Sequence, residues 1–277
     1  MEELCEALEV SRSGYYAHLH KPEGARRQED QRLEASLAAA FEESHRTYGT
    51  PRLRAVLSHQ GQSVSRARIA RLMRGMGLTP LRKRAFIPRT TIADPTALPA
   101  PNLLQELGPV TRPDEVWVTD ITYIPTQEGW LYLAAVMDLH SRRILGWSTA
   151  PHLRSSLVTE AIQRARFTRS SRPLKGTILH SDRGCQYTSA QCRQTLELLR
   201  MTPSMSRTAN CYDNATMESF WASLKTEAFT SIPATHAIAR LLIHQYIDAF
   251  YNTRRLHSSL GFQSPVTFES SFRNTLN

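Results

Sequence analysis

The stretch VWVTDITYI, residues 116–124, decides the fold class. It is rich in β-branched and aromatic residues, which favour a β-strand. A polar turn at 127–129 separates it from a second run of this kind at 130–137, and a turn near 140–141 leads to a third at 143–149. Three strands joined by short turns predict an antiparallel meander.

The chain beyond this meander changes to alternating elements. A helix is expected over 155–168, a short strand over 176–181, and mainly helical segments from there to the C-terminus. Three antiparallel strands followed by alternating helix and strand predict an α/β domain over 113–272. We expect a ribonuclease-H-like fold, a mixed five-stranded sheet with helices on both faces.

Residues 1–87 have the pattern of an all-α region. Helices are expected over 2–9, from Ser11 onwards with Ser11 as N-cap, and over 26–43. Two further helices, 51–59 and 65–76, are separated by a turn at Gly61, with Ser65 as the second N-cap. This outline predicts a helix-turn-helix, a DNA-binding unit whose second helix enters the major groove. On that helix the residues expected to face a small core are Ala67, Ile69, Ala70 and Met73.

Prolines separate the two regions. The segment 88–112 contains several of them, so we expect a linker or extended arm there. The sequence contains no apolar run of about 18 residues, so no membrane-spanning helix is expected. The four cysteines are scattered without a C-x-x-C pair, which argues against a zinc module or a disulfide framework and suits a reducing cytoplasm.

The charge distribution points to a polyanionic partner. The formal net charge is +9, and residues 46–93 contain eleven Lys or Arg and no Asp or Glu. Contact with DNA phosphates is the interpretation that this stretch favours. The cations expected to face DNA from the second helix are Arg66, Arg68, Arg71 and Arg74. The alternative is a three-helix bundle with a solvated arginine face.

Three carboxylates stand out by position, although each has a simpler explanation. Asp120 lies in mid-strand on the face of Val116 and Val118, where it needs a cationic partner, either an arginine or a metal ion. Asp182 follows an apolar strand, at the edge where α/β sites form, but an Asp there also caps turns. Glu218 lies on an expected helix, where a solvated side chain is the ordinary case. Only the three together predict a site.

The spacing of Asp120, Asp182 and, 35 residues further on, Glu218 resembles the signature shared by retroviral integrases and several transposase families. The surrounding text narrows this to a resemblance to the catalytic protein of IS-three-family insertion sequences, covering nearly the whole chain. Six segments carry the resemblance: YGTPRLRAVL (48–57), WVTDITYI (117–124), MDLHSRRILGW (137–147), HSDRGCQYTS (180–189), SRTANCYDNATMESFWASLKTE (206–227) and YNTRRLHSSLGFQSP (251–265). Departures are Ala209, Cys185 and Thr216, which stand where Gly, Ser and Pro are common.

The resemblance implies a DNA transposase that cleaves and joins element ends. Its chemistry needs two Mg²⁺ ions, with Mn²⁺ as a substitute. We expect Asp120 to bridge the ions and Asp182 and Glu218 to bind one each. Lys225, two helical turns after Glu218, and Asn214, one turn before it, are further DNA-contact candidates. Arg254 and Arg255 are candidates for DNA contact or support of the site.

The partners implied are double-stranded DNA, a second copy of the chain on that DNA, and an upstream segment of the kind to which this family's protein is often fused. Two alternatives stay open. One is a nuclease or junction resolvase that uses the same metal site without strand transfer. The other is a regulator that binds element ends through the helix-turn-helix and has lost activity. The acidic triad argues against the regulator, and the separate DNA-binding region argues against a simple nuclease.

Overall fold

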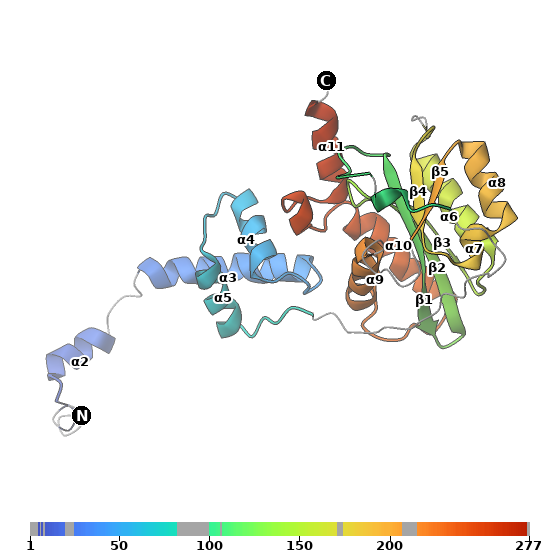
Figure 1. Cartoon of the computed structure of the whole chain (residues 1–277). Helices are drawn as coiled ribbons and strands as arrows, with labels where there is room; N and C mark the ends of the chain where they lie inside the picture. Colours follow the sequence, from blue (N-terminus) through green and yellow to red (C-terminus); the bar gives the residue numbers. More distant parts are fainter. Residues whose placement is uncertain are drawn as a thin grey trace. The chain divides into compact units, whose positions relative to one another are not determined.

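A computed structural model describes residues 5, 7, 9–19, 25–81, 100–105, 107–170, 174–206 and 215–275. The chain divides into two compact units, Met1–Pro80 and Leu81–Asn277, each of which is described by itself. In Figure 1 the first runs from blue to teal and the second from green to red. Within the described ranges, no helix has both the length and the apolar composition that a membrane crossing requires.

The described residues of the first unit include four helices: α2 (Arg12–Leu19), α3 (Ala25–Glu43), α4 (Thr50–His59) and α5 (Arg66–Gly75). The last three contact one another around a small core that includes Leu37, Leu53 and Ile69, all fully buried. The Ser65 hydroxyl accepts a hydrogen bond from the Arg68 amide (3.3 Å), as an N-cap does. The helix-turn-helix prediction is therefore confirmed.

One detail of this unit differs from expectation. Ala67 is exposed and Leu72 is buried instead, because the face of α5 that meets α3 and α4 is rotated relative to the predicted one. The N-cap at Ser11 is confirmed, since its hydroxyl accepts from the Gly14 amide at 3.0 Å. The helix expected over 2–9 lies largely outside the described residues.

The second unit is built on one five-stranded sheet in the order β3-β2-β1-β4-β5. Its strands are β1 (Val116–Thr126), β2 (Gly129–Asp138), β3 (Ile144–Ala150), β4 (Ile178–Ser181) and β5 (Thr202–Met205). The first three pair antiparallel, whereas β4 runs parallel to β1 and β5 runs parallel to β4. The predicted meander and the mixed sheet are both confirmed.

Helices cover both faces of the sheet (Figure 1). On one face lie α6 (Ser155–Thr168), α7 (Cys185–Thr188) and α8 (Ala190–Leu199); on the other lie α9 (Ala215–Glu227) and α10 (His236–His244). A π-helical segment, Gln245–Tyr251, continues α10, and α11 (Pro265–Thr275) follows. This arrangement has the ribonuclease-H-like architecture expected from the sequence.

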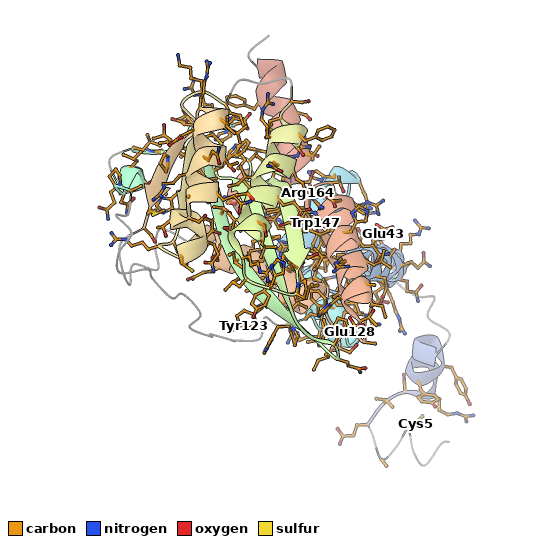
Figure 2. The ribbon with its side chains drawn as sticks, turned by 90° about the vertical axis from the view of Figure 1, so that its right-hand side faces the viewer. Cys5, Glu43, Tyr123, Glu128, Trp147 and Arg164 are labelled. Carbon is orange, nitrogen blue, oxygen red and sulfur yellow. The ribbon has the colours of Figure 1, made fainter. Side chains whose placement is uncertain are left out.

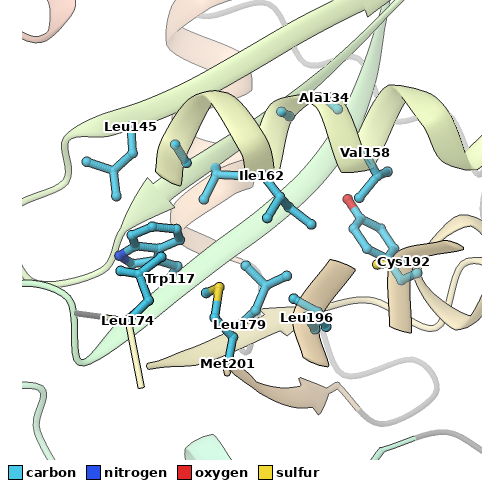
Figure 3. Close-up of a cluster of buried hydrophobic side chains, with 14 of the residues drawn as sticks. Trp117, Ala134, Leu145, Val158, Ile162, Leu174, Leu179, Cys192, Leu196 and Met201 are labelled. Atoms are coloured by element: carbon cyan, nitrogen blue, oxygen red, sulfur yellow. The ribbon is translucent and has the colours of Figure 1, made fainter. Parts of the chain in front are cut away.

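The main core lies between the sheet and α6 (Figure 3). Trp117 of β1, Ile162 of α6 and Leu196 of α8 are among its buried side chains. Close packing here requires a glycine on β3, because a Cβ at Gly146 would lie 2.3 Å from the Ala165 nitrogen of α6. Glycine therefore lets the helix backbone approach the strand.

Side chains cover the outer edge of β3, which pairs with no further strand in the described sheet. The Arg164 guanidinium lies 5.8 Å from the Trp147 ring and donates to the Trp147 carbonyl oxygen at 3.1 Å (Figure 2). Asn252 exchanges two hydrogen bonds with the Ile144 backbone, each 2.9 Å. Such coverage hinders unwanted pairing at a sheet edge.

Part of the expected linker is attached to this unit. The Leu103 amide donates to the Ser204 hydroxyl at 3.0 Å, and the Met205 amide donates to the Pro101 carbonyl oxygen at 3.2 Å. Residues 100–105 therefore follow the outer side of β5 and include a 3-10 turn at Leu103–Gln105. Residues 88–99 of the expected linker lie outside the described residues.

Candidate active site

Asp120 lies in β1, and Asp182 directly follows β4, the neighbouring strand that runs parallel to β1. The β1–β4 register pairs Trp117 with Leu179 and Val118 with His180; β4 ends at Ser181, so Asp182 directly follows it, near the level of Asp120 in β1. Adjacent strands are about 4.8 Å apart, and residues in register point to the same face. The two carboxylates therefore project together at the carboxyl end of β4, where sites form in α/β sheets.

A buried tyrosine supports this proximity. Burial raises the pKa of the Tyr187 phenol well above its ordinary value, and the charges of Asp120 and Asp182 raise it further. The charges of both carboxylates thus act on this one side chain. The Tyr187 hydroxyl lies 3.4 Å from the Thr119 hydroxyl, next to Asp120 in β1.

A turn fixes Asp182 locally. Its Oδ1 accepts a hydrogen bond from the Gly184 amide at 2.9 Å. The turn-capping explanation for this residue is thus correct, and it is compatible with a functional role because the same bond orients the carboxylate. A Cβ at Gly184 would lie 3.0 Å from Asp182 Oδ1, so the turn leaves little space for a side chain.

Helix α9 covers Asp120 from the other side. The Trp221 indole nitrogen donates to Asp120 Oδ2 at 2.9 Å. Lys225, one turn further along α9, is half-buried with its ammonium 4.9 Å from the Tyr123 ring centroid. Burial lowers the pKa of Lys225, and the negative charge of Asp120 opposes that shift. Lys225 therefore belongs to the surroundings of Asp120, on the same side of α9 as Trp221.

Glu218 lies in the first turn of α9, one turn before Trp221, and its side chain is exposed. Across the part of the chain that the structure describes, no three His, Cys, Asp or Glu side chains are gathered closely enough to hold a metal ion. The structure thus brings Asp120 and Asp182 together and leaves Glu218 apart from them, on the helix that touches Asp120. The joint role of the three acids stays a prediction.

The residues present fit a hard divalent cation. Carboxylate oxygens are the ligands that Mg²⁺ prefers, and Mg²⁺ keeps several waters, so two adjacent carboxylates are a sufficient beginning for a site. The hydrogen bond from Trp221 to Asp120 is of the kind that orients a metal ligand from outside the coordination sphere.

Sequence reasoning missed Trp221 and Tyr187. The signal for Trp221 was its spacing, since a residue three positions after Glu218 lies on the same side of a helix. For Tyr187 there was no comparable signal. The position of Tyr187 depends on how α7 packs on the face of the sheet that α6 and α8 cover.

Comparison with known proteins gives an independent view of the chain. Two family models described as "Integrase core domain" match residues 110–211 and 199–265, and one described as "HTH-like domain" matches residues 28–86. A 31 kDa protein of insertion element IS600 from Shigella sonnei is 41% identical over 97% of this chain and 98% of its own length. The transposase InsF of insertion sequence IS3A from Escherichia coli is 39% identical over 96% of this chain and 93% of its own. The chain belongs to the IS3 family of insertion-sequence transposases.

Among solved structures, the catalytic core domain of BIV integrase is similar to the IS3-family chain with a TM-score of 0.43 and 16% identity. The similarity covers 58% of this chain and 97% of that one. The family assignment rests on the sequence relatives.

One DNA-contact candidate of this IS3-family protein is corrected by the structure. Arg255 is 3% exposed and buried between helices. Its guanidinium donates to both carboxylate oxygens of Glu227, at 2.8 and 2.7 Å, and to the Ser223 hydroxyl. Burial lowers the pKa of Arg255, but Glu227 more than compensates, so the net shift is upwards. Arg255 therefore holds the end of α9 in place, which is the support role expected for it as the alternative to DNA contact. Arg254 is exposed and stays a candidate, and Asn214 lies outside the described residues.

The arginine helix α5 is also less free than its sequence suggests. Arg68 donates to Asp30 at 2.8 Å and to Glu29 at 2.9 Å, and Arg71 donates to Asp30 at 2.6 Å. The expectation that no acid balances this stretch is therefore wrong for these two side chains, because α3 supplies the acids. Arg66 and Arg74 are exposed, and the assignment of all four arginines to DNA stays a prediction.

Proposed function

We propose that the protein is a DNA transposase that cleaves insertion-sequence ends and joins them to target DNA. The observation that carries this proposal is the position of Asp120 in β1 and of Asp182 at the end of the adjacent parallel strand β4, in a chain of the IS3 family. A simple nuclease is less well supported, because the chain also carries a helix-turn-helix unit and its relatives are transposases.

The proposed chemistry is metal-dependent phosphoryl transfer. Asp120, Asp182 and Glu218 would hold two divalent cations, with Mg²⁺ as the natural ion and Mn²⁺ as a substitute. Bound there, such ions stabilise the attacking and the leaving oxygen of a phosphodiester. Trp221 keeps the Asp120 carboxylate oriented, and Lys225 places a positive charge beside the same carboxylate, where a DNA phosphate can approach. Glu218 must approach the aspartates through movement of the first turn of α9.

The domain roles follow the two units. We assign end recognition to residues 1–87, connection to 88–112 and catalysis to 113–272. Double-stranded DNA is the proposed substrate, and the reaction takes place in the bacterial cytoplasm. An insertion sequence has two ends, so at least two copies of the chain are required on the DNA. An upstream segment of the kind fused to this family's protein is a further proposed partner.

A strand-transfer assay tests the proposal. Labelled duplex with the terminal sequence of the element is incubated with Mg²⁺, target DNA and either the wild type or Asp182→Asn. Joined products are expected only with the wild type. Glu160→Gln, an exposed acid on α6 at the opposite face of the sheet, is the matched control and should join normally. Cleavage of any duplex without joining would contradict transposition, and equal joining by Asp182→Asn would contradict the site.

A further inference from the structure

A pocket beside the start of α9 has no part in the site described above. Its volume is about 530 Å³, and it is lined by the β2–β3 turn, the first turn of α9 and part of α11. Leu139, Leu260 and Phe268 contribute apolar wall, while Arg142 and Thr216 contribute polar groups. A pocket with apolar walls and a few convergent polar groups is the usual form of a ligand site.

Arg142 is the charged group of this pocket. Its backbone has φ +62°, a left-handed conformation at the β2–β3 turn that is uncommon for a residue with a side chain. The guanidinium donates a hydrogen bond to the Thr216 hydroxyl at the start of α9. Burial lowers the pKa of Arg142, although an arginine stays protonated in proteins. The pocket therefore contains a half-buried cation.

Among the residues that the structure describes, this guanidinium forms no direct ion pair, although the charge of the Asp138 carboxylate acts on it. Its neighbour Arg143 is paired with Glu269 at 2.7 Å. The nearby Asp138 carboxylate already accepts hydrogen bonds from the Asp114 amide and from the Ser141 amide and hydroxyl, at 2.7 to 2.8 Å. A half-buried cation without a direct ion pair has N–H donors left over, and a bound anion would supply the charge-assisted hydrogen bonds that they lack.

The donors that converge here suit a phosphate group. A guanidinium has five N–H donors in a planar fork that matches phosphate oxygens, and the bond to Thr216 uses one of them. The Thr216 hydroxyl accepts that bond through its oxygen, so its own proton can be donated to an anion. The amides in the first turn of α9 have no partners within the helix and favour negative charge at the same end.

The distance from the pocket to the carboxylates can be worked from α9. Thr216 lies at the pocket and Trp221 at Asp120, five residues apart, which is about 7.5 Å along a helix axis. Successive phosphates of one DNA strand are spaced by about 3.4 Å along the duplex. Five residues also rotate a helix by about 140°, so the pocket and Asp120 lie on different sides of α9 and within a few nucleotides of each other along one DNA strand.

We infer that the pocket binds a non-scissile phosphate of the DNA strand that is cut, with the Arg142 guanidinium and the Thr216 hydroxyl as donors. This inference rests on the proposed function, because it takes the scissile phosphate to lie at Asp120. Binding there also joins the β2–β3 turn to the first turn of α9, which carries Glu218. Arg142 is a substrate-binding residue in this assignment and has no role in holding metal.

The test is a binding titration in EDTA, so that catalysis plays no part. End duplexes in which a single phosphate is replaced by a neutral methylphosphonate are titrated with the full chain, one position at a time. In the wild type, one replacement within a few nucleotides of the cleaved bond should weaken binding about tenfold. In Arg142→Gln the same replacement should have no further effect, and the slope of log K against log salt should fall by about one.

Two variants provide controls. Arg164→Gln removes an exposed arginine from α6, and Arg142→Lys keeps the positive charge. Both should retain the response to the methylphosphonate, and tryptophan fluorescence verifies that Arg142→Gln is folded. An equal response in the wild type and in Arg142→Gln at every position would overturn the inference, as would a lost response in Arg164→Gln. If the wild type and Arg142→Gln bind end DNA equally well, only the assignment of the pocket is refuted. If the wild type binds no end DNA, the proposed function is refuted.

Discussion

The substitution Glu269→Gln tests how the C-terminal helix α11 is held to the catalytic unit. The Glu269 side chain is 2% exposed and forms ion pairs with Arg143, at 2.7 Å, and with Arg169. Arg169 is 1% exposed and has a second acid, Asp114, at 2.7 Å. The change to glutamine keeps the shape of the side chain and removes its charge, which leaves Arg169 with only one of its two acids.

Breaking a buried ion pair by removing one partner costs about 3–5 kcal/mol, because the other charge stays buried. Asp114 still neutralises part of Arg169, so we expect the lower end, about 3 kcal/mol. That is a large share of a domain stability of about 5–15 kcal/mol. The exposed i,i+4 pair Glu160–Arg164 provides the comparison, since Glu160→Gln should cost only about 0.3–0.5 kcal/mol.

Tryptophan fluorescence during urea unfolding is the appropriate assay. All four tryptophans, Trp117, Trp130, Trp147 and Trp221, lie in the unit Leu81–Asn277, so the signal reports on that unit alone. A loss of stability in Glu269→Gln no larger than in Glu160→Gln would refute the reasoning.

The pH dependence of folding stability gives a second test of the ion pairs of Glu269. Burial by itself raises the pKa of Glu269, but the hydrogen bond and charge of Arg169, followed by those of Arg143, bring it below the ordinary value of 4.5. Because the pKa of Glu269 is lower in the folded state, its ion pairs contribute fully to the stability above pH 4.5. This contribution is lost as the pH falls through the folded-state pKa. The stabilities of wild type and Glu269→Gln should therefore converge below pH 4.5. A constant difference at all pH values would contradict this.

Two further changes probe the carboxylate site and the arginine helix. Trp221→Phe removes the hydrogen bond to Asp120, so Mg²⁺ affinity measured by calorimetry should fall about tenfold, and an unchanged affinity would exclude an orienting role. Asp30→Asn releases Arg71 and partly releases Arg68, so binding to end DNA should become tighter and its log–log salt slope steeper by about one. Identical slopes in wild type and variant would show that these arginines do not face DNA.

Much of the fold follows from local pattern. The β-branched run around Asp120 predicts its strand, and the serine before Arg66 predicts the start of α5, because both depend on residues close in sequence. The adjacency of Asp120 and Asp182 is harder, since it requires β4 to pair parallel with β1 in one register. The order of strands and helices predicts the ribonuclease-H-like sheet that contains this pairing. The spacing to Glu218 distinguishes these two aspartates from the other acids as candidates for the site.

The remaining contacts depend on tertiary packing that no local pattern encodes. Asp30 and Arg68 are 38 residues apart in sequence, so an acid-free interval around α5 did not predict an acid-free surface. Arg255 lies in a basic stretch that suggests DNA contact, yet the fold buries it against Glu227. Trp221 reaches Asp120 across 101 residues, and only the position of α9 over β1 reveals it.

The most direct test of the carboxylate site is the binding of Mn²⁺, followed by electron paramagnetic resonance of the free ion. Wild type, Asp120→Asn, Asp182→Asn and the control Glu160→Gln are titrated under the same conditions. Each aspartate variant should lose at least about tenfold in affinity, because a direct ligand contributes no less than an outer-shell partner. Glu160→Gln should match the wild type. Equal Mn²⁺ binding by wild type and both aspartate variants would contradict a metal site at Asp120 and Asp182.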